Sequence, residues 1–352
     1  MKSKTLDIAT VSRNAWERLV IDPTLGVISL LVIFSLIAAF AFPVFYAGNN
    51  IYNLVGSSIT VMILAVGMTI VLISGGIDLS VGAVMALCAG TAASVIKLGA
   101  PLWVAFLCAL LVGVIAGLLN GFLVTRVGLP DFIGTLAMLG LASGVLYIAT
   151  QGVPIIGYMP SEYYVIGGLE PLFGPVTLPM VVALVLALAA GWLLSRTKLG
   201  THFFAVGSNA VAARQSGVSV RWVKTQAYVI SGVCAAIAGI ILAGRNNNVP
   251  ADLGTGYEIQ AISAAIIGGA SLMGGRGRVL GAILGALTLA LAINIINLAG
   301  VPSSFQKIVI GAILLLAVIA NYLSELARNA ALRRRAKRDS QAPSLERTKK
   351  EI

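Results

Sequence analysis

Charged residues are scarce in this sequence. Asp, Glu, Lys and Arg together make up 11% of its 352 residues, whereas soluble domains carry about 25%. The chain is 58% hydrophobic, and its apolar stretches of about 20 residues are long enough to cross a bilayer as helices. Strand-like alternation over about ten residues is absent. The composition excludes an ordinary soluble domain and predicts an all-α polytopic membrane protein.

Residues that carry catalysis, metal binding or redox chemistry are also few. The single histidine, His202, has no Cys or Glu at metal-ligand spacing, and the three cysteines, Cys88, Cys108 and Cys234, lie inside apolar runs without disulfide spacing. The chain has no G-x-x-x-x-G-K-S/T phosphate-binding loop. No set of nucleophile, base and orienting residue can be assembled. We therefore expect a protein that is not an enzyme and holds no cofactor or metal of its own.

The apolar stretches predict about ten transmembrane helices. They lie at roughly 27–46, 53–73, 81–97, 101–124, 132–150, 175–195, 226–244, 258–273, 279–298 and 304–323. The eighth stretch is short and rich in glycine, so a broken or re-entrant element is an open alternative there. We expect a cytoplasmic segment at 1–26, a membrane domain at 27–323 with an inside loop at 196–225, and a basic cytoplasmic tail at 324–352.

Cationic residues are unevenly distributed between the connecting segments. With a cytoplasmic N-terminus, 21 of the 24 Lys and Arg residues lie inside, and Lys97, Arg245 and Lys307 lie outside. The positive-inside rule then puts both termini of a multi-pass membrane protein in the cytoplasm. The net charge of +11 reflects this topology and contact with anionic lipids, not nucleic-acid binding.

Glycines recur at a spacing of four residues in three helices. Small residues at this spacing let helix backbones approach closely in lipid. Packing within the chain is one explanation, and contact with a second copy or sister chain is the other. The three sets are Gly113, Gly117 and Gly121; Gly277, Gly281 and Gly285; and Gly140 with Gly144.

The stretch ISGGIDLSVG (73–82) interrupts two apolar runs. Gly75 and Gly76 can adopt the left-handed backbone that ends a helix, and Asp78 or Ser80 can then accept from the first N–H groups of the next helix. An acid at this inner surface costs less than one at the bilayer centre. Helix capping accounts for Asp78, and a direct part in gating is the open alternative. A similar glycine-rich turn, IIGGASLMGG (266–275), also falls on the inside.

The longest inside loop, 196–224, contains a candidate short helix. Ser208 or Asn209 can cap a helix through AVAARQS, and Gly217 can end it. The alternative is a solvated amphipathic loop without a specific role.

Five segments in this order resemble hallmark segments of ABC-importer permeases of the ribose-type sugar family. They are GGIDLSVGA, LPDFIGTLAML, TKLGTHFFAVG, GSNAVAARQSGV and GTGYEIQAISAAIIGGASLMGGRGRVLGAILGA. The resemblance runs from about residue 50 to 320. Two features depart from the family pattern: the tail after 328 is longer, and Asp131 stands where a small residue or proline is commoner. We expect Asp131 to be a helix cap after Pro130.

The resemblance implies a location in the bacterial inner membrane, an architecture like that of the type II ABC importers, and separate subunits for separate tasks. A second permease chain, identical or related, would complete the path, a periplasmic solute-binding protein would deliver a pentose or similar sugar, and ATPase subunits would carry ATP and Mg²⁺. These ATPases would dock on the short helix of the inside loop. In this sequence the implied coupling residues are Gly207, Asn209, Ala212, Ala213, Arg214, Ser216 and Gly217. Arg214 is the charged member of the set and can pair with an ATPase acid or carbonyl.

Contacts with the solute are predicted only from residue type and depth. The candidates are Tyr147, Gln151, Gln260, Asn294 and Asn297. Each of them is also explained by a hydrogen bond between helices. The outside segment RNNNVPADLGTGYE could instead touch the binding protein.

The competing reading is a self-sufficient secondary transporter or channel for a small polar solute. Ion-coupled carriers keep an acid or histidine inside the bundle as a relay. Asp78 and Asp131 both lie at predicted span ends, which argues against this class.

Overall fold

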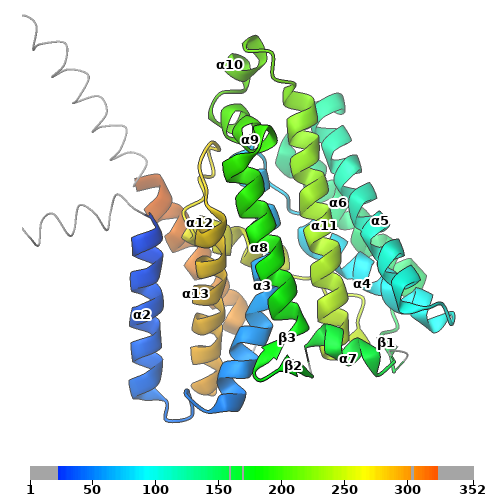
Figure 1. Ribbon diagram of the computed structural model, residues 1–352, viewed down its shortest axis with the longest axis vertical. Coiled ribbons are helices and arrows are strands. Elements are labelled where there is room, and N and C mark those ends of the chain that lie inside the picture. Colours follow the sequence, from blue (N-terminus) through cyan, green and yellow to red (C-terminus); the bar gives the residue numbers. More distant parts are fainter. Residues whose placement is uncertain (1–22, 158–159, 169, 303–304, 324–352) are drawn as a thin grey trace, which may run out of the picture.

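A computed structural model describes residues 23–157, 160–168, 170–302 and 305–323. The predicted segment 1–26 lies almost wholly, and the predicted tail 324–352 entirely, outside the described residues. In the described part the chain is a helical bundle with a small cap of short strands at one end (Figure 1).

Eight helices in the described part are long and apolar enough to cross a membrane. Each overlaps one of the predicted spans, and the π-helical turn η1 (Leu123–Val127) extends α5 at its end. The eight are α2 (Pro23–Ala41), α3 (Gly48–Ile73), α5 (Leu102–Phe122), α6 (Asp131–Thr150), α8 (Leu178–Arg196), α11 (Val220–Asn246), α13 (Val279–Leu298) and a last helix at Gln306–Leu323.

Two further apolar helices are shorter: α4 (Val81–Lys97) and α12 (Tyr257–Ile267). The eleven residues of α12 extend about 16 Å at roughly 1.5 Å per residue, about half of a hydrocarbon core of roughly 30 Å. The predicted eighth span, 258–273, is therefore too long. Gly268 and Gly269 end the helix, Gly269 with a φ of +88°. The count of ten crossings stays a prediction.

Helices α3 and α11 form the centre of the bundle. In their most apolar windows 89% and 78% of the residues are buried, against 11% in α2. Helix α11 contacts α3, α4 and α5. Hydrophobic side chains of all four helices make up the largest buried cluster.

Two of the three glycine repeats pack within the chain. A Cβ on Gly113 or Gly117 of α5 would overlap backbone atoms of α11, and one on Gly281 would overlap Gly268. Gly140 and Gly144 of α6 are different, because a Cβ there would meet nothing within 4 Å. The explanation by packing within the chain is wrong for this pair.

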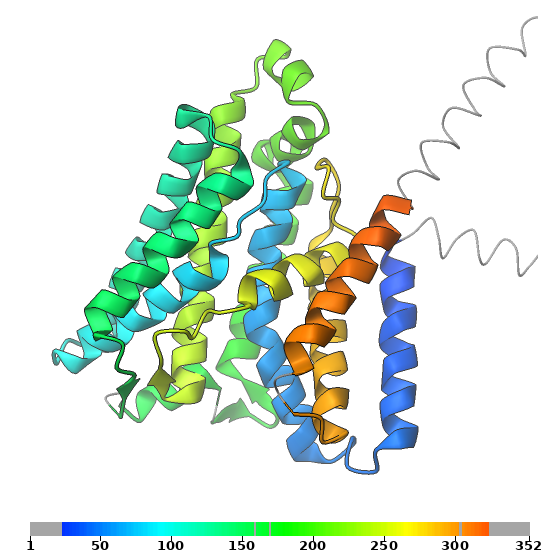
Figure 2. The same cartoon turned by 180° about the vertical axis from the view of Figure 1, so that it is seen from behind.

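The two ends of the bundle differ in structure. At one end lie two short helices, α9 (Lys198–Ser208) and α10 (Ala210–Gln215). The start of α2 and the end of the last helix face the same way but lie nearer the middle of the bundle (Figures 1 and 2). At the opposite end, the cap end, lies α7 (Glu162–Gly167) with the short strands β1 (Ile155–Ile156), β2 (Pro171–Phe173), β3 (Val176–Thr177) and β4 (Asn248–Val249). Strand β1 pairs antiparallel with β4, and β2 with β3. The buried Tyr163 fastens the cap to α11 through a hydrogen bond to the Ile240 carbonyl (3.1 Å).

Candidate functional site

Local hydrogen bonds shape the segment between α8 and α11. The Asn209 side chain accepts from the backbone N–H groups of Val211 and Ala212, each at 3.0 Å, so Asn209 caps α10. Gly217 has a φ of +82°, and the N–H of Val218 returns to the Ala213 carbonyl (3.0 Å). The predicted Asn209 cap and Gly217 end are confirmed. Ser208, the other candidate cap, is the last residue of α9.

Helix α9 was not predicted. The Thr197 side chain starts it by accepting from the N–H of Gly200 (3.1 Å), and Phe203 and Val206 hold it by being buried in the bundle. A threonine cap three residues before Gly200 is a usable sequence signal. The predicted coupling residue Gly207 lies on this helix, next to its end.

Helix α10 has one buried and one exposed face. Ala213 is buried, whereas Ala212, Arg214, Ser216 and Gly217 are exposed. Val211 is 68% exposed and was not among the predicted residues.

Three glycine-containing segments meet beneath α10, and we term this the three-glycine contact: Gly75 after α3, Gly207 on α9, and Gly274 with Gly275 before α13. The N–H of Gly275 donates to the carbonyl of Ile73 (2.9 Å). A Cβ on Gly207 would overlap that same carbonyl oxygen and approach the Gly275 nitrogen to 2.6 Å. A Cβ on Gly75, which has a φ of +75°, would lie 3.4 Å from the Gly207 Cα. The two similar glycine-rich turns of the sequence are thus neighbours in space, joined by α9.

Residues 74–80, which join α3 to α4, form neither helix nor strand. Side chains of other helices satisfy their backbone groups. From α11, Lys224 Nζ donates to the Gly75 carbonyl (3.1 Å) and the Tyr228 hydroxyl to the Ile77 carbonyl (3.4 Å). From α6, the Thr135 hydroxyl accepts from the N–H of Leu79 (3.1 Å). Irregular backbone is tolerated at membrane depth only when such partners surround it.

Asp78 is the centre of a buried polar cluster and is only 2% exposed. Its carboxylate accepts from the Ser80 N–H (3.0 Å), the Ser80 hydroxyl (2.6 Å) and the Ser231 hydroxyl of α11 (2.7 Å). Asn120 Nδ2 of α5 donates to the Ser80 oxygen (2.8 Å). Neither predicted cap of α4 forms in the described part of the chain: the Ser80 side chain makes no capping bond, and the N–H that Asp78 binds is that of Ser80, before the helix begins. The Asp78 carboxylate instead joins three parts of the bundle, and its position at the inner membrane surface stays a prediction.

Asp131 takes a different role from the predicted helix cap. It is the first residue of α6, whose N-terminus has no side-chain capping bond. Its Oδ2 forms an ion pair with Lys224 Nζ (3.2 Å). Because Lys224 also binds the Gly75 carbonyl, the pair fastens the 74–80 segment to α6 and α11.

A cavity of about 350 Å³ lies at the cap end, between α3, α11, α12, α13 and the last helix. We term it the outer cavity. Three of the five predicted solute residues line it: Gln260, Asn294 and Asn297. Asn294 exchanges hydrogen bonds with Asn50 (2.8 and 3.3 Å), and Asn297 accepts from Gln306 (2.7 Å). Asn294 and Asn297 thus line the cavity and also form the hydrogen bonds between helices that were the alternative explanation for them.

The other two predicted solute residues lie elsewhere. Tyr147 is 62% exposed on α6, and Gln151 ends α6 in the left-handed conformation with a φ of +54°. Neither lines the outer cavity. Sequence reasoning missed Arg245 of α11, which does line it. Arg245 lies in an asparagine-rich segment predicted to be outside. The sequence around it does not indicate the cavity, because helices that are far apart in the sequence enclose it.

Comparisons with known proteins give a consistent result. A family model described as branched-chain amino acid transport system / permease component matches residues 50–318. The chain is 37% identical to the ribose import permease protein RbsC of Escherichia coli (strain K12) over 301 residues, 84% of this chain and 92% of that protein. It is 34% identical to the protein of the same name from Haemophilus influenzae over 296 residues, 83% and 91% of the two chains. It is 39% identical to the autoinducer 2 import system permease protein LsrC of Salmonella paratyphi B over 258 residues, 72% of each.

Proposed function

This chain belongs to the family of branched-chain amino acid transport system permease components, and from that membership we propose that it carries a small polar sugar across the bacterial inner membrane, powered by ATP hydrolysis on a separate subunit. It is a multi-pass membrane permease of the ABC-importer type. The names of the relatives, ribose and autoinducer 2 import permeases, support a pentose or similar monosaccharide as the solute. The chain itself would hold no cofactor, and ATP with Mg²⁺ would bind the ATPase.

The three-glycine contact beneath α10 is the observation that carries the proposal. An ATPase subunit docked on the exposed face of α10 would push on α9, whose Gly207 touches the end of α3 and the segment before α13 through backbone atoms. Backbone contacts cannot yield by changing a side-chain rotamer. Movement of α10 would therefore reach α3 and α13 directly, and residues 74–80 would act as the gate between α3 and α4.

Basic residues support a cytoplasmic position for the α9–α10 end. Three described cations, Lys97, Arg245 and Lys307, belong to the cap end. The larger group lies at or near the α9–α10 end: Arg126, Arg196, Lys198, Arg214, Arg221, Lys224, Arg276 and Arg278. The positive-inside rule assigns the richer end to the cytoplasm. The periplasmic binding protein would then deliver the sugar to the cap end, where the outer cavity offers Gln260, Asn294 and Asn297.

A second permease chain would complete the path. The exposed Gly140 and Gly144 of α6 support a contact surface there, because small residues allow close helix approach in lipid. The same small-residue surface of α6 would serve for contact with an identical chain or with a related one.

The test is uptake of radiolabelled D-ribose by proteoliposomes that contain the chain, its ATPase and its binding protein. We expect uptake that requires ATP, and a loss of at least about tenfold in Arg214→Glu, because the reversed charge would repel an acidic ATPase surface. Lys307→Glu, a charge reversal at the cap end, is the matched control and should transport normally. Ion-gradient-driven uptake by the chain alone, without any ATPase, would instead establish the secondary-transporter reading.

A further inference from the structure

One guanidinium group stands apart from the rest of the outer cavity's polar lining. Arg245, in the last turn of α11, is the only charged residue among the described residues that line the cavity. Within the described part of the chain no carboxylate pairs with it, and its one hydrogen bond there is long, from Nη2 to the Asn53 carbonyl (3.4 Å). A guanidinium has five N–H donors, so most of its donors have no described protein partner.

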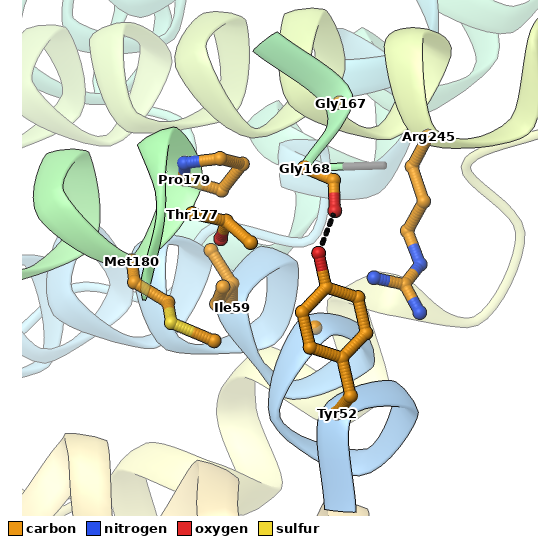
Figure 3. Close-up of a pocket in the computed structure, with 9 residues that line it drawn as sticks. Tyr52, Ile59, Gly167, Gly168, Thr177, Pro179, Met180 and Arg245 are labelled. Carbon is orange, nitrogen blue, oxygen red and sulfur yellow. Dashed lines mark hydrogen bonds between the residues drawn. The ribbon is translucent and has the colours of Figure 1, made fainter. Parts of the chain in front are cut away.

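The surrounding backbone is shaped to hold this side chain. A Cβ on Gly56 of α3 would overlap the guanidinium of Arg245, so only glycine leaves room for the arginine at that point. In Figure 3 the guanidinium lies beside the Tyr52 ring, whose hydroxyl donates to the Gly168 carbonyl of the cap (2.8 Å). Arg245 thus forms part of the wall between the cap and the cavity.

The remaining polar groups of the lining are neutral and can both donate and accept hydrogen bonds. Side-chain amides and hydroxyls each offer both donors and acceptors, as sugar hydroxyls also do. The Gln260 side chain has no hydrogen-bond partner in the described part of the chain, so its amide is available. The polar neighbours of Arg245 in the cavity are Asn53, Ser57, Tyr257, Gln260, Asn294, Asn297 and Gln306.

We propose that Arg245 is the specificity-determining residue of the outer cavity and that it binds two adjacent hydroxyl oxygens of a small neutral polyol. The proposal rests on the proposed function and names the solute chemistry of the same path. The fork of guanidinium N–H groups matches two neighbouring oxygens. The cavity of about 350 Å³ lies at the small end of the range of ligand pockets, roughly 300–1,000 Å³. The other polar lining groups are uncharged amides and hydroxyls, which match the hydroxyls of a neutral solute.

A purely structural role for Arg245 is the competing explanation, since its bond to Asn53 links α11 to α3. The two roles differ in what they change. A structural arginine sets the stability of the solute-free protein, whereas a recognition arginine sets affinity and the preference between solutes.

The experiment is calorimetric titration of the purified full-length chain in lipid nanodiscs, without ATP, ATPase or binding protein. The probes are D-ribose, ribitol, 2-deoxy-D-ribose and D-ribonate at millimolar concentrations. We expect ribose and ribitol to bind, and 2-deoxyribose, which lacks the 2-hydroxyl, to bind about tenfold or more weakly, as expected for the loss of one hydrogen bond to a charged group.

Variants separate the two roles. Arg245→Met should abolish ribose binding, and Arg245→Lys should weaken it about tenfold because it keeps the charge and loses the fork. Both should melt close to the wild type in the absence of solute. Lys307→Met, which removes an exposed cation at the same end, should bind ribose normally.

Four results would overturn the proposal: no binding of any polyol to the wild type, unchanged binding in Arg245→Met, tighter binding of ribonate than of ribose, or a large fall in the melting temperature of solute-free Arg245→Met. Because the titration contains no ATPase, failure of ATP-driven import with retained polyol binding would reject the proposed function and leave this inference standing.

Discussion

The three-glycine contact and the outer cavity show opposite ways of building a functional region in one bundle. At the contact, backbone meets backbone with no room for a Cβ on Gly207. At the cavity, long polar side chains from α3, α11, α12, α13 and the last helix surround open space. The first arrangement is stiff and suits the transfer of a displacement. The second is adaptable and suits recognition of a solute. Substitutions should therefore have large effects at the contact and graded effects at the cavity.

The largest effect is expected for Gly207→Ala. The added methyl group would overlap the Ile73 carbonyl oxygen and force α9 away from α3, at a typical cost of about 1–3 kcal/mol for overpacking. ATP-driven uptake should fall at least tenfold, because the displaced helix carries α10 with it. Uptake and melting temperature are measured together in the reconstituted complex.

Gly191→Ala is the matched control for this substitution, since a Cβ there on α8 meets nothing within 4 Å. It should leave uptake unchanged and raise stability slightly, as Gly to Ala does inside helices. Equal uptake by the Gly207 and Gly191 variants would remove the contact from the coupling path.

A smaller effect is expected for Asp78→Asn. The substitution keeps the shape but removes the charge from hydrogen bonds with Ser80 and Ser231, and charge-assisted bonds of this kind contribute about 1.5–3 kcal/mol each. We expect a fall in the free energy of unfolding of about 2–3 kcal/mol, measured by thermal denaturation in detergent.

A double-mutant cycle with Ser231→Ala should show a coupling energy above about 0.5 kcal/mol. The exposed Asp252→Asn at the cap end is the control and should change nothing. Full stability of Asp78→Asn together with abolished transport would favour the gating role over the structural one.

Asn209→Ala should cost about 1 kcal/mol, the usual loss for removing a helix cap. The loss is local to α10, so the measurement is hydrogen exchange at the amides of Val211 and Ala212, which should speed up about fivefold. Ser208→Ala, one residue earlier, should leave their exchange unchanged. Faster exchange in the Ser208 variant would mean that the cap was assigned to the wrong residue.

The smallest effect is expected for Gln260→Ala in the outer cavity. Other amides line the same space, so the KM for ribose uptake should rise only two- to fivefold, with the ATPase rate of the complex unchanged. Tyr147→Phe, outside the cavity, should leave the KM as it is. A KM effect at Tyr147 and none at Gln260 would place the solute path along α6 instead.

Local features of the site could be predicted, because neighbouring residues in the chain determine them. Asn209 caps α10 through N–H groups two and three residues ahead, and Gly217 ends the helix with the left-handed backbone that glycine tolerates. The same reasoning applied to Thr197 would have found α9. The end of α12 at Gly268 was missed because an apolar run was followed across two glycines.

Long-range features could not be predicted in this way. Asp78 accepts a hydrogen bond from Ser231, which is 153 residues away on α11. The burial of Asp78 therefore depends on a helix that lies outside the stretch 73–82. Arg245 could be assigned to the outside from charge counting, but its cavity exists only when five helices have come together. Sequence patterns describe such residues by type, and packing decides what they do.

The irregular 74–80 segment also constrains how the protein is made. Its backbone groups depend on α6 and α11, and the partner of Gly75, Lys224, is synthesised 149 residues later. At translation rates of about 5–20 residues per second, Lys224 emerges roughly 7–30 s after Gly75. Backbone N–H and C=O groups without hydrogen-bond partners are unstable in lipid. We therefore expect the α3–α4 pair to stay within reach of water or of the insertion machinery until α11 has been inserted.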